Sequence, residues 1–286
     1  MMIKPYLFAF ADEACPQMDG QIRAMVRNRL NGLEIRGVNG KNITQLTVPE
    51  AAEIRTQLAD HGLTVWSVGS PIGKISIHGD FAAHKDLLRH TLELANTLGA
   101  ANLRMFSFYM PQGEDPDQYR SQVLDQMGQM LELARDSGVA LCHENEKGIY
   151  GDIADRCLIL HDAFPALKAV FDPANFVQCR EDTLRAWSML NPFVHYLHIK
   201  DALADGSVVP AGMGIGNVPA IVKDYLTNGG TVMTVEPHLA IFDGLKALEQ
   251  PGAQSIVGER KVYPDADTAF DAACTALRTI LEEVLQ

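Results

Sequence analysis

Four short segments of this chain each place a metal-capable side chain where a run of apolar, strand-forming residues ends. The segments are LCHENE (141–146), AVFDPANF (169–176), YLHIKD (196–201) and TVEPHL (234–239). The side chains are Glu144, Asp172, His198 and Glu236, which follow one another at intervals of 28, 26 and 38 residues. An interval of that size suits one strand and one helix. The sequence therefore predicts four parallel strands whose ends bring these side chains together.

Strand-like and helix-like runs alternate along the whole chain. Eight apolar runs are predicted to be strands, at 6–10, 33–36, 63–69, 101–108, 139–144, 168–172, 194–199 and 231–236. Their nearly continuous apolar character is typical of strands that are covered on both faces. Eight strand–helix units close naturally into a barrel, so we expect an α/β fold of the (β/α)8 TIM-barrel class, with a single domain over residues 1–286. An open, doubly wound sheet is the alternative.

Composition limits the partners of the chain. Its net charge of −12 argues against a nucleic-acid partner, which requires a basic surface, and no apolar run is long enough to span a membrane. The five cysteines show no regular spacing, so we expect reduced thiols and a cytoplasmic location. One long connection, 239–264, is interpreted either as a lid or subunit contact at the barrel mouth, or as a surface loop with a short helix at 243–249.

Three carboxylates that meet at one point repel one another unless a cation lies between them. Oxygen-rich ligation with one nitrogen suits Mn²⁺, Mg²⁺ or Co²⁺, and Zn²⁺ is an alternative. Such an ion stabilises the enediolate that forms when a carbon next to a carbonyl loses its proton. One carboxylate can remove that proton and a second can return one. Glu144 and Glu236, on the predicted fifth and eighth strands, could flank a bound substrate in this way.

The motifs HEN, DPANF, HIKD and VEP, at the ends of the predicted fifth to eighth strands, resemble those of the xylose-isomerase-like TIM-barrel superfamily. That superfamily contains sugar isomerases and epimerases, inosose dehydratases and endonuclease IV. The resemblance covers essentially the whole chain and implies that Glu144, Asp172, His198 and Glu236 bind one divalent ion. In the ketose 3-epimerases of the group the two glutamates also transfer protons, which implies catalytic roles for Glu144 and Glu236.

Two departures from the superfamily pattern narrow this expectation. Asn175 stands where the family often has a histidine, and an amide can bond a hydroxyl but cannot shuttle a proton. The repair endonucleases bind further zinc ions through histidines on earlier strands. Here His61, His78, His84 and His90 fall on predicted helices or loops, which together with the acidic charge argues against DNA cleavage.

Substrate recognition is predicted for four residues that lie just beyond the candidate ligands: Glu146, Asn175, Lys200 and His238. Glu146 is also an alternative ligand to Glu144, although the Glu-Asn register of the family favours Glu144. Three further charged residues either face the polar site or pair internally: Glu34, Arg36 and Arg104. His143 and His195 are interpreted as packed histidines, and Trp66 as a core residue rather than an apolar wall for a sugar.

The glycine-rich segment 210–219 does not fit a dinucleotide-binding motif, because Asn217 stands where a third glycine is needed, and we interpret it as a flexible loop after the seventh strand. The leading hypothesis is a divalent-metal-dependent isomerase or epimerase of a sugar or sugar-like ketone, which uses two-base proton transfer. The alternatives are a metal-dependent dehydratase of a keto-polyol such as an inosose, and a sugar-binding barrel without catalysis. We expect a small carbohydrate as substrate and neither nucleic acid nor membrane as partner; the sequence leaves self-association open.

Overall fold

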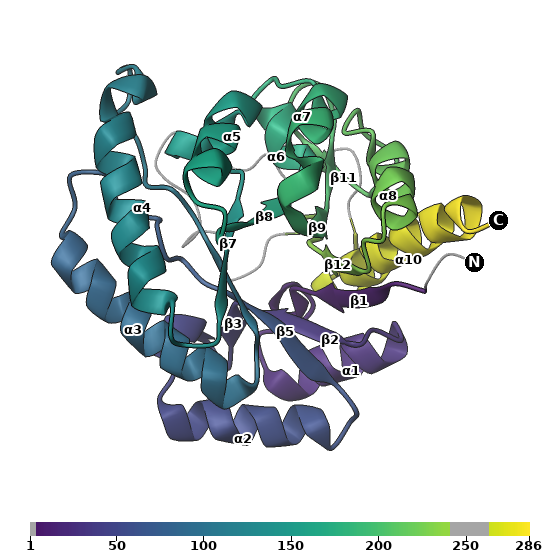
Figure 1. Cartoon of the computed structure of the whole chain (residues 1–286). Coiled ribbons are helices and arrows are strands. Elements are labelled where there is room, and N and C mark those ends of the chain that lie inside the picture. The colour runs from purple at the N-terminus through teal and green to yellow at the C-terminus, as the bar shows by residue number, and fades with distance from the viewer. Residues whose placement is uncertain (1–3, 241–262) are drawn as a thin grey trace.

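The computed structural model describes residues 4–240 and 263–286 and contains a closed barrel of eight parallel strands (Figure 1). In chain order the barrel strands are β1 (Tyr6–Ala9), β2 (Gly32–Ile35), β5 (Thr64–Gly69), β6 (Asn102–Met105), β7 (Ala140–Glu144), β8 (Lys168–Phe171), β9 (Val194–Ile199) and β12 (Val232–Val235). Each strand pairs with the next, and β12 pairs with β1 to close the ring. All eight predicted strands are confirmed, and the closed ring excludes the open sheet. The fourth strand is shorter than predicted, because it ends at Met105 rather than at 108.

Helices connect the strands and surround the barrel (Figure 1). They are α1 (Met18–Arg27), α2 (Val48–Ala59), α3 (Phe81–Leu98), α4 (Arg120–Ala134), α5 (Ala154–Ala163), α6 (Pro173–Gln178), α7 (Thr183–Leu190), α8 (Val218–Thr227) and α10 (Ala266–Val284). Two short hairpins follow barrel strands: β3 (Gly37–Val38) with β4 (Lys41–Asn42), and β10 (Asp201–Ala202) with β11 (Val208–Val209). The final helix, α10, packs against α1 and α8 and so completes the outer layer next to β1.

Local signals in the sequence set the ends of the helices. α2 begins with a capping box, in which the Thr47 hydroxyl accepts a hydrogen bond from the Glu50 N–H and the Glu50 carboxylate accepts one from the Thr47 N–H. α3 ends at Gly99, whose φ of 77° lies in the left-handed region that glycine adopts most readily. The apolar face of α10, which includes Phe270 and Leu277, is buried against the barrel.

The barrel interior changes from apolar to polar toward the carboxyl ends of the strands. An apolar floor is formed by Phe8, Cys142, Val170, Tyr196 and Val232, with Trp66 packed against it. Successive side chains of a strand point to opposite faces, so residues two positions apart share the inward face. Two positions beyond three of the floor residues lie Glu144, Asp172 and His198. The strands therefore point polar side chains inward above the apolar floor. This is the carboxyl end of the barrel, where the active sites of such barrels lie.

The cysteines and the helices add two observations about the described residues. All five cysteines are free thiols. Within the described ranges, no helix combines the length and the apolar character that a membrane span requires. Most of the long connection predicted at 239–264, including the short helix at 243–249, lies outside the described residues.

Candidate metal centre at the carboxyl end of the barrel

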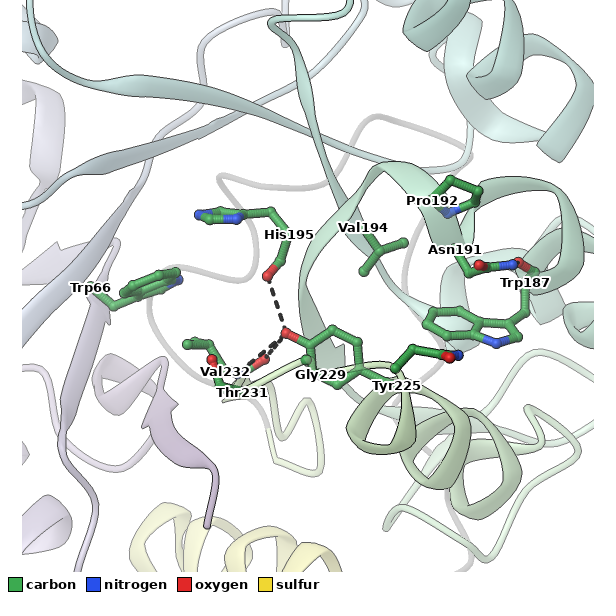
Figure 2. Close-up of a pocket in the computed structure, with 12 residues that line it drawn as sticks. Trp66, Trp187, Asn191, Pro192, Val194, His195, Tyr225, Gly229, Thr231 and Val232 are labelled. Atoms are coloured by element: carbon green, nitrogen blue, oxygen red, sulfur yellow. Dashed lines mark hydrogen bonds between the residues drawn. The ribbon is translucent and has the colours of Figure 1, made fainter. Parts of the chain in front are cut away.

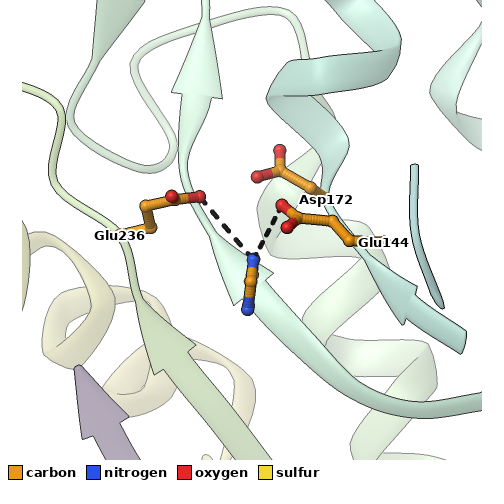
Figure 3. A group of neighbouring side chains, drawn as sticks. Glu144, Asp172 and Glu236 are labelled. Carbon is orange, nitrogen blue, oxygen red and sulfur yellow. Dashed lines mark hydrogen bonds and ion pairs between the residues drawn. The ribbon is translucent and has the colours of Figure 1, made fainter. Parts of the chain in front are cut away.

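Four side chains from consecutive barrel strands converge above the apolar floor. Glu144 is the last residue of β7, Asp172 directly follows β8, and His198 lies near the end of β9. Glu236 directly follows β12. All four are buried, and each offers one ligand atom that lies within 4.8 Å of the other three (Figure 3). The structure thus brings together the four side chains that the strand ends predicted.

His198 is held between carboxylates on both sides of its ring. Its Nδ1 lies 2.9 Å from Glu144 Oε1 and 3.6 Å from Glu236 Oε2, and its Nε2 lies 3.0 Å from Glu34 Oε2. Burial alone would lower the pKa of His198, but the negative charges of Glu144 and Glu34 outweigh it and raise the pKa to about 10. The ring is therefore fixed in place by the groups around both of its nitrogens.

Each of the three candidate carboxylate ligands also has a buried cation beside it. Lys200 Nζ lies 2.8 Å from Glu236 Oε2 and 3.0 Å from Asp172 Oδ2. Arg104 donates a hydrogen bond of 3.0 Å from Nη1 to Glu144 Oε2. These cations offset part of the repulsion that three buried carboxylates would otherwise cause.

The donor set fits a divalent cation. Ligand atoms about 2.1 Å from an ion lie roughly 3 to 4 Å from one another in an octahedral shell, and the four donors are already within 4.8 Å. One Asp172 oxygen, Oδ1, caps α6 by accepting a bond from the Asn175 N–H. The other, Oδ2, is buried within the cluster and pairs with Lys200 Nζ at 3.0 Å. The four residues could therefore hold a metal ion without rearrangement of the strands.

Three of the four predicted substrate-binding residues contact the candidate ligands. Asn175 donates from Nδ2 to Glu144 Oε1 at 3.2 Å, and Lys200 pairs with Asp172 and Glu236 as described above. His238 Nε2 lies 3.5 Å from Glu236 Oε1, and the residue adopts a φ of 43°, which is uncommon outside glycine.

Glu146 has a different position, because β7 ends at Glu144 and the extended backbone does not continue. It is partly exposed and pairs with Lys74 at 3.1 Å. The cluster of candidate ligands therefore includes Glu144 and not Glu146.

A group of charged residues around Arg36 was not predicted as a unit. The Arg36 guanidinium donates to Asp12 at 3.0 Å, to Glu13 at 2.9 Å and to Glu236 at 3.3 Å. The Glu13 carboxylate in turn accepts a bond of 2.6 Å from the backbone N–H of His238. Glu13, Glu236 and His238 form a second group of possible ligand atoms, but Arg36 already supplies a positive charge there. The only sequence signal for Glu13 is its position shortly after the first strand.

Contacts show where other charged and aromatic residues lie relative to the cluster. Glu34 and Arg104 face the site, since both touch candidate ligands. His143 is packed and bonds to the Ser107 hydroxyl at 2.9 Å. Trp66 is half-buried, packs against the apolar floor and stacks on Phe8 and on His195, below the site.

The glycine-rich loop at 210–219 is organised around one carboxylate. Asp201 accepts hydrogen bonds from the backbone N–H groups of Gly212, Gly214 and Gly216, at 2.9 to 3.0 Å. Added Cβ atoms at Gly214 and Gly216 would lie 2.3 and 2.6 Å from Asp201 Oδ1, so side chains there would collide with it. The glycines thus permit a close approach between loop and carboxylate.

A cavity of about 560 Å³ lies at the opposite, amino-terminal end of the barrel (Figure 2). It is lined by Trp66, His195 and Tyr225, and by the first residues of β9 and β12, Val194 and Val232. The Tyr225 hydroxyl donates to backbone carbonyls in its wall. Because the ionisable cluster lies at the other end of the same strands, this cavity is separate from the candidate metal centre.

Comparison with known proteins agrees with this architecture. Residues 27–250 match the family described as xylose isomerase-like TIM barrel. A search of curated proteins gave no match. Among solved structures, D-allulose 3-epimerase from Methylomonas sp. in complex with D-allulose has a TM-score of 0.74 and 15% identity, with 98% of each chain covered.

Two further structures show the range of related proteins. A probable 3-DHS dehydratase from Bacillus anthracis has a TM-score of 0.73 and 17% identity, with 96% of this chain and 99% of that chain covered. The IOLI protein with a bound zinc atom has a TM-score of 0.74 and 12% identity, with 98% and 99% covered. Likeness at these identities concerns the fold, whereas the family match extends over most of the sequence. The chain belongs to the xylose isomerase-like TIM barrel family.

Proposed function

We propose that the chain is a divalent-metal-dependent isomerase or epimerase that acts on a sugar or a sugar-like ketone. The observation that carries the proposal is the buried cluster of Glu144, Asp172, His198 and Glu236, with its four ligand atoms within 4.8 Å. Glu144 ends β7 and Glu236 directly follows β12, and β8 and β9 lie between these two strands in the barrel. The two glutamates therefore approach the centre from different sides. The D-allulose 3-epimerase of the same fold, which was solved with D-allulose, supports a ketose as the substrate class.

The residues of the site suit a proton transfer on a carbon next to a carbonyl. A divalent cation, when bound, would polarise the substrate oxygens and make the neighbouring C–H more acidic. Glu144 and Glu236 would then act as the two bases, one removing the proton and the other returning one. Lys200 would donate a hydrogen bond to the oxygen that gains negative charge. Asn175 and His238 would bind hydroxyl groups, and Glu146 would contact the substrate at the rim.

A dehydratase is the second candidate, because Glu13 has the character of a general acid. Burial raises the pKa of Glu13 to about 8, despite the opposing charge of Arg36, so its carboxyl group retains a proton near neutral pH. The contacts point the same way, since Glu13 shares the Arg36 guanidinium with Asp12 and Glu236. A protonated carboxyl group could protonate a leaving hydroxyl, and a probable dehydratase shares the fold.

One NMR experiment separates these functions. The protein is incubated with Mn²⁺ and a panel of ketoses and keto-polyols in D₂O, and the Mn²⁺ is removed before spectra are recorded. An isomeric product that contains solvent deuterium supports the epimerase. A product that has lost water, whose formation stops in Glu13→Gln, supports the dehydratase. No conversion across the panel, with binding detected by calorimetry, would contradict both and leave a sugar-binding barrel.

A further inference from the structure

We propose that Glu34 is a positioning residue that orients His198, so that Nδ1 of the imidazole faces the three candidate carboxylate ligands. The inference rests on the proposed metal centre and adds to it a residue from the opposite side of the barrel. Glu34 lies in β2, 164 positions before His198, and the two side chains meet only because the barrel closes.

The contact between the two side chains determines which imidazole nitrogen is available to a cation. Glu34 Oε2 lies 3.0 Å from His198 Nε2, and both side chains are 0% exposed. An ionised carboxylate can only accept a hydrogen bond, so the nitrogen that faces it retains its hydrogen. The other nitrogen, Nδ1, faces Glu144 and Glu236 and is the nitrogen that would exchange its proton for a cation held among these carboxylates. A carboxylate behind a metal-binding histidine generally acts in this way.

Glu34 is itself fixed by the layer beneath it. Its Oε1 accepts hydrogen bonds from the Tyr196 hydroxyl at 2.9 Å and from the Ser67 hydroxyl at 3.2 Å, and Arg104 Nε lies 3.9 Å away. Tyr196 is two positions before His198 on β9, so both side chains point inward from the same strand. The chain of contacts therefore runs from the apolar floor through Tyr196 and Glu34 to the imidazole.

Two other roles for Glu34 give different expectations. As a direct ligand it would have to reach the centre, but its carboxylate lies on the Nε2 side of the ring, away from the Nδ1 that faces Glu144. As a simple charge partner of Arg104 it would affect stability and leave the imidazole orientation unchanged. Only a positioning role predicts that its loss weakens metal binding and changes which nitrogen of His198 binds the ion.

The test uses Zn²⁺, which is diamagnetic, with the full-length chain and its Glu34→Gln, Glu34→Ala and Tyr196→Phe variants. Calorimetry measures the dissociation constant of Zn²⁺, and ¹⁵N NMR of ring-labelled histidine identifies the coordinating nitrogen of His198. The His198 signals are assigned by their absence in His198→Gln. Circular dichroism checks that each variant is folded; Glu34→Gln and Tyr196→Phe keep nearly the original shape and suffice if Glu34→Ala does not fold.

Loss of such a carboxylate typically weakens metal binding about 10- to 100-fold. We expect that weakening in Glu34→Ala, and a smaller one in Glu34→Gln, whose amide oxygen can still accept from Nε2. Tyr196→Phe should weaken binding in the parent chain but add little in the Glu34→Ala background, because its effect passes through Glu34. Coordination through Nδ1 should be uniform in the parent chain and mixed in the Glu34 variants.

Failure of this inference can be told apart from failure of the metal centre. If the parent chain binds Zn²⁺ through His198 and the folded Glu34 variants bind it equally well through Nδ1, Glu34 does not position the ring and only this inference is overturned. If the parent chain binds no divalent ion, or binds it without His198, the proposed metal centre is overturned as well.

Discussion

At the scale of single residues, different neighbouring cations lower the pKa values of Glu144 and Glu236 in the same centre. Burial would raise the pKa of Glu144, but His198 and Arg104 outweigh it and the net pKa is lowered. Burial acts in the same direction on Glu236, and there Lys200 is the strongest opposing charge and holds the pKa well below its usual range. Both glutamates are therefore ionised, which is the form that a base requires.

We predict that Glu144→Gln and Glu236→Gln each lower kcat by at least about 100-fold, since general acid–base catalysis contributes roughly 10² to 10⁴. Glutamine keeps the shape and one oxygen ligand but cannot take up a proton. Because both residues are candidate ligands, kcat must be measured at equal metal occupancy. Glu146→Gln is the matched control, as Glu146 lies outside the cluster, and its effect should fall mainly on KM. A Gln variant with nearly full kcat at full occupancy would remove that glutamate from the mechanism.

The sequence predicted the candidate ligands but not the residues that support them. Glu144, Asp172, His198 and Glu236 could be found because each ends an apolar run that is visible locally. Glu34 shows the same pattern at the end of β2, yet its partner is on β9, and only the closed barrel brings the two together. Glu13 lies in a short 3-10 turn with no strand periodicity, so its contacts with Arg36 and His238 had no local signal.

At the scale of elements, the loop after β11 depends on a close fit between Asp201 and its glycines. An added Cβ at Gly214 would lie 2.3 Å from Asp201 Oδ1 and 2.4 Å from the backbone oxygen of Ala202. The carboxylate could not move away without leaving buried N–H groups of the loop without an acceptor. The loop was predicted to be flexible, whereas the structure gives it three hydrogen bonds to the Asp201 side chain.

We therefore predict that Gly214→Ala lowers the free energy of unfolding by about 1 to 3 kcal/mol, the usual effect of overpacking. Gly128→Ala on α4 is the control, because its Cβ would be no closer than 3.4 Å to Phe164 and alanine favours a helix by up to about 1 kcal/mol. Urea denaturation of both variants measures the difference. Equal stability of Gly214→Ala and the parent chain would mean that the loop is not held by Asp201.

A second prediction at this scale concerns His84, which joins α3 to the loop after β5. Its Nε2 accepts a hydrogen bond of 2.7 Å from the Gly73 N–H, which only the neutral ring can do, and burial lowers its pKa to about 4. As the pH falls from 6.5 toward 4, the unfolded chain gains a proton at this site and the folded chain does not. The stability that His84 contributes is thus complete above about pH 6.5 and is lost below it.

His84→Gln isolates this effect, because the glutamine oxygen can accept the same bond without titrating. We expect the parent chain to lose about 1 to 2 kcal/mol more than His84→Gln between pH 6.5 and 4, after allowance for partial solvent screening. Chemical denaturation at several pH values gives both curves. Parallel curves would show that His84 is protonated in the folded chain with a normal pKa.

At the scale of the whole molecule, the alternation of apolar runs was sufficient to predict the barrel. All eight strands were predicted because parallel strands covered by helices are apolar on both faces. The fourth strand was predicted too long, since the apolar run at 101–108 continues past Met105 into residues that pack without pairing in the barrel. Barrel closure produces no local sequence pattern. Side-chain contacts across the barrel therefore could not be predicted from the sequence.

The proposed function depends most on a single divalent ion at Glu144, Asp172, His198 and Glu236. The direct measurement is the metal content of Mn²⁺-loaded, desalted protein by mass spectrometry, together with the melting temperature before and after chelation. We predict one ion per chain in the parent protein and in Glu146→Gln, and a melting temperature that falls on chelation because the ion stabilises only the folded chain. Asp172→Ala and His198→Ala should lose most of the ion and the chelation effect. Full occupancy in these two variants, or no ion in the parent protein, would contradict the account.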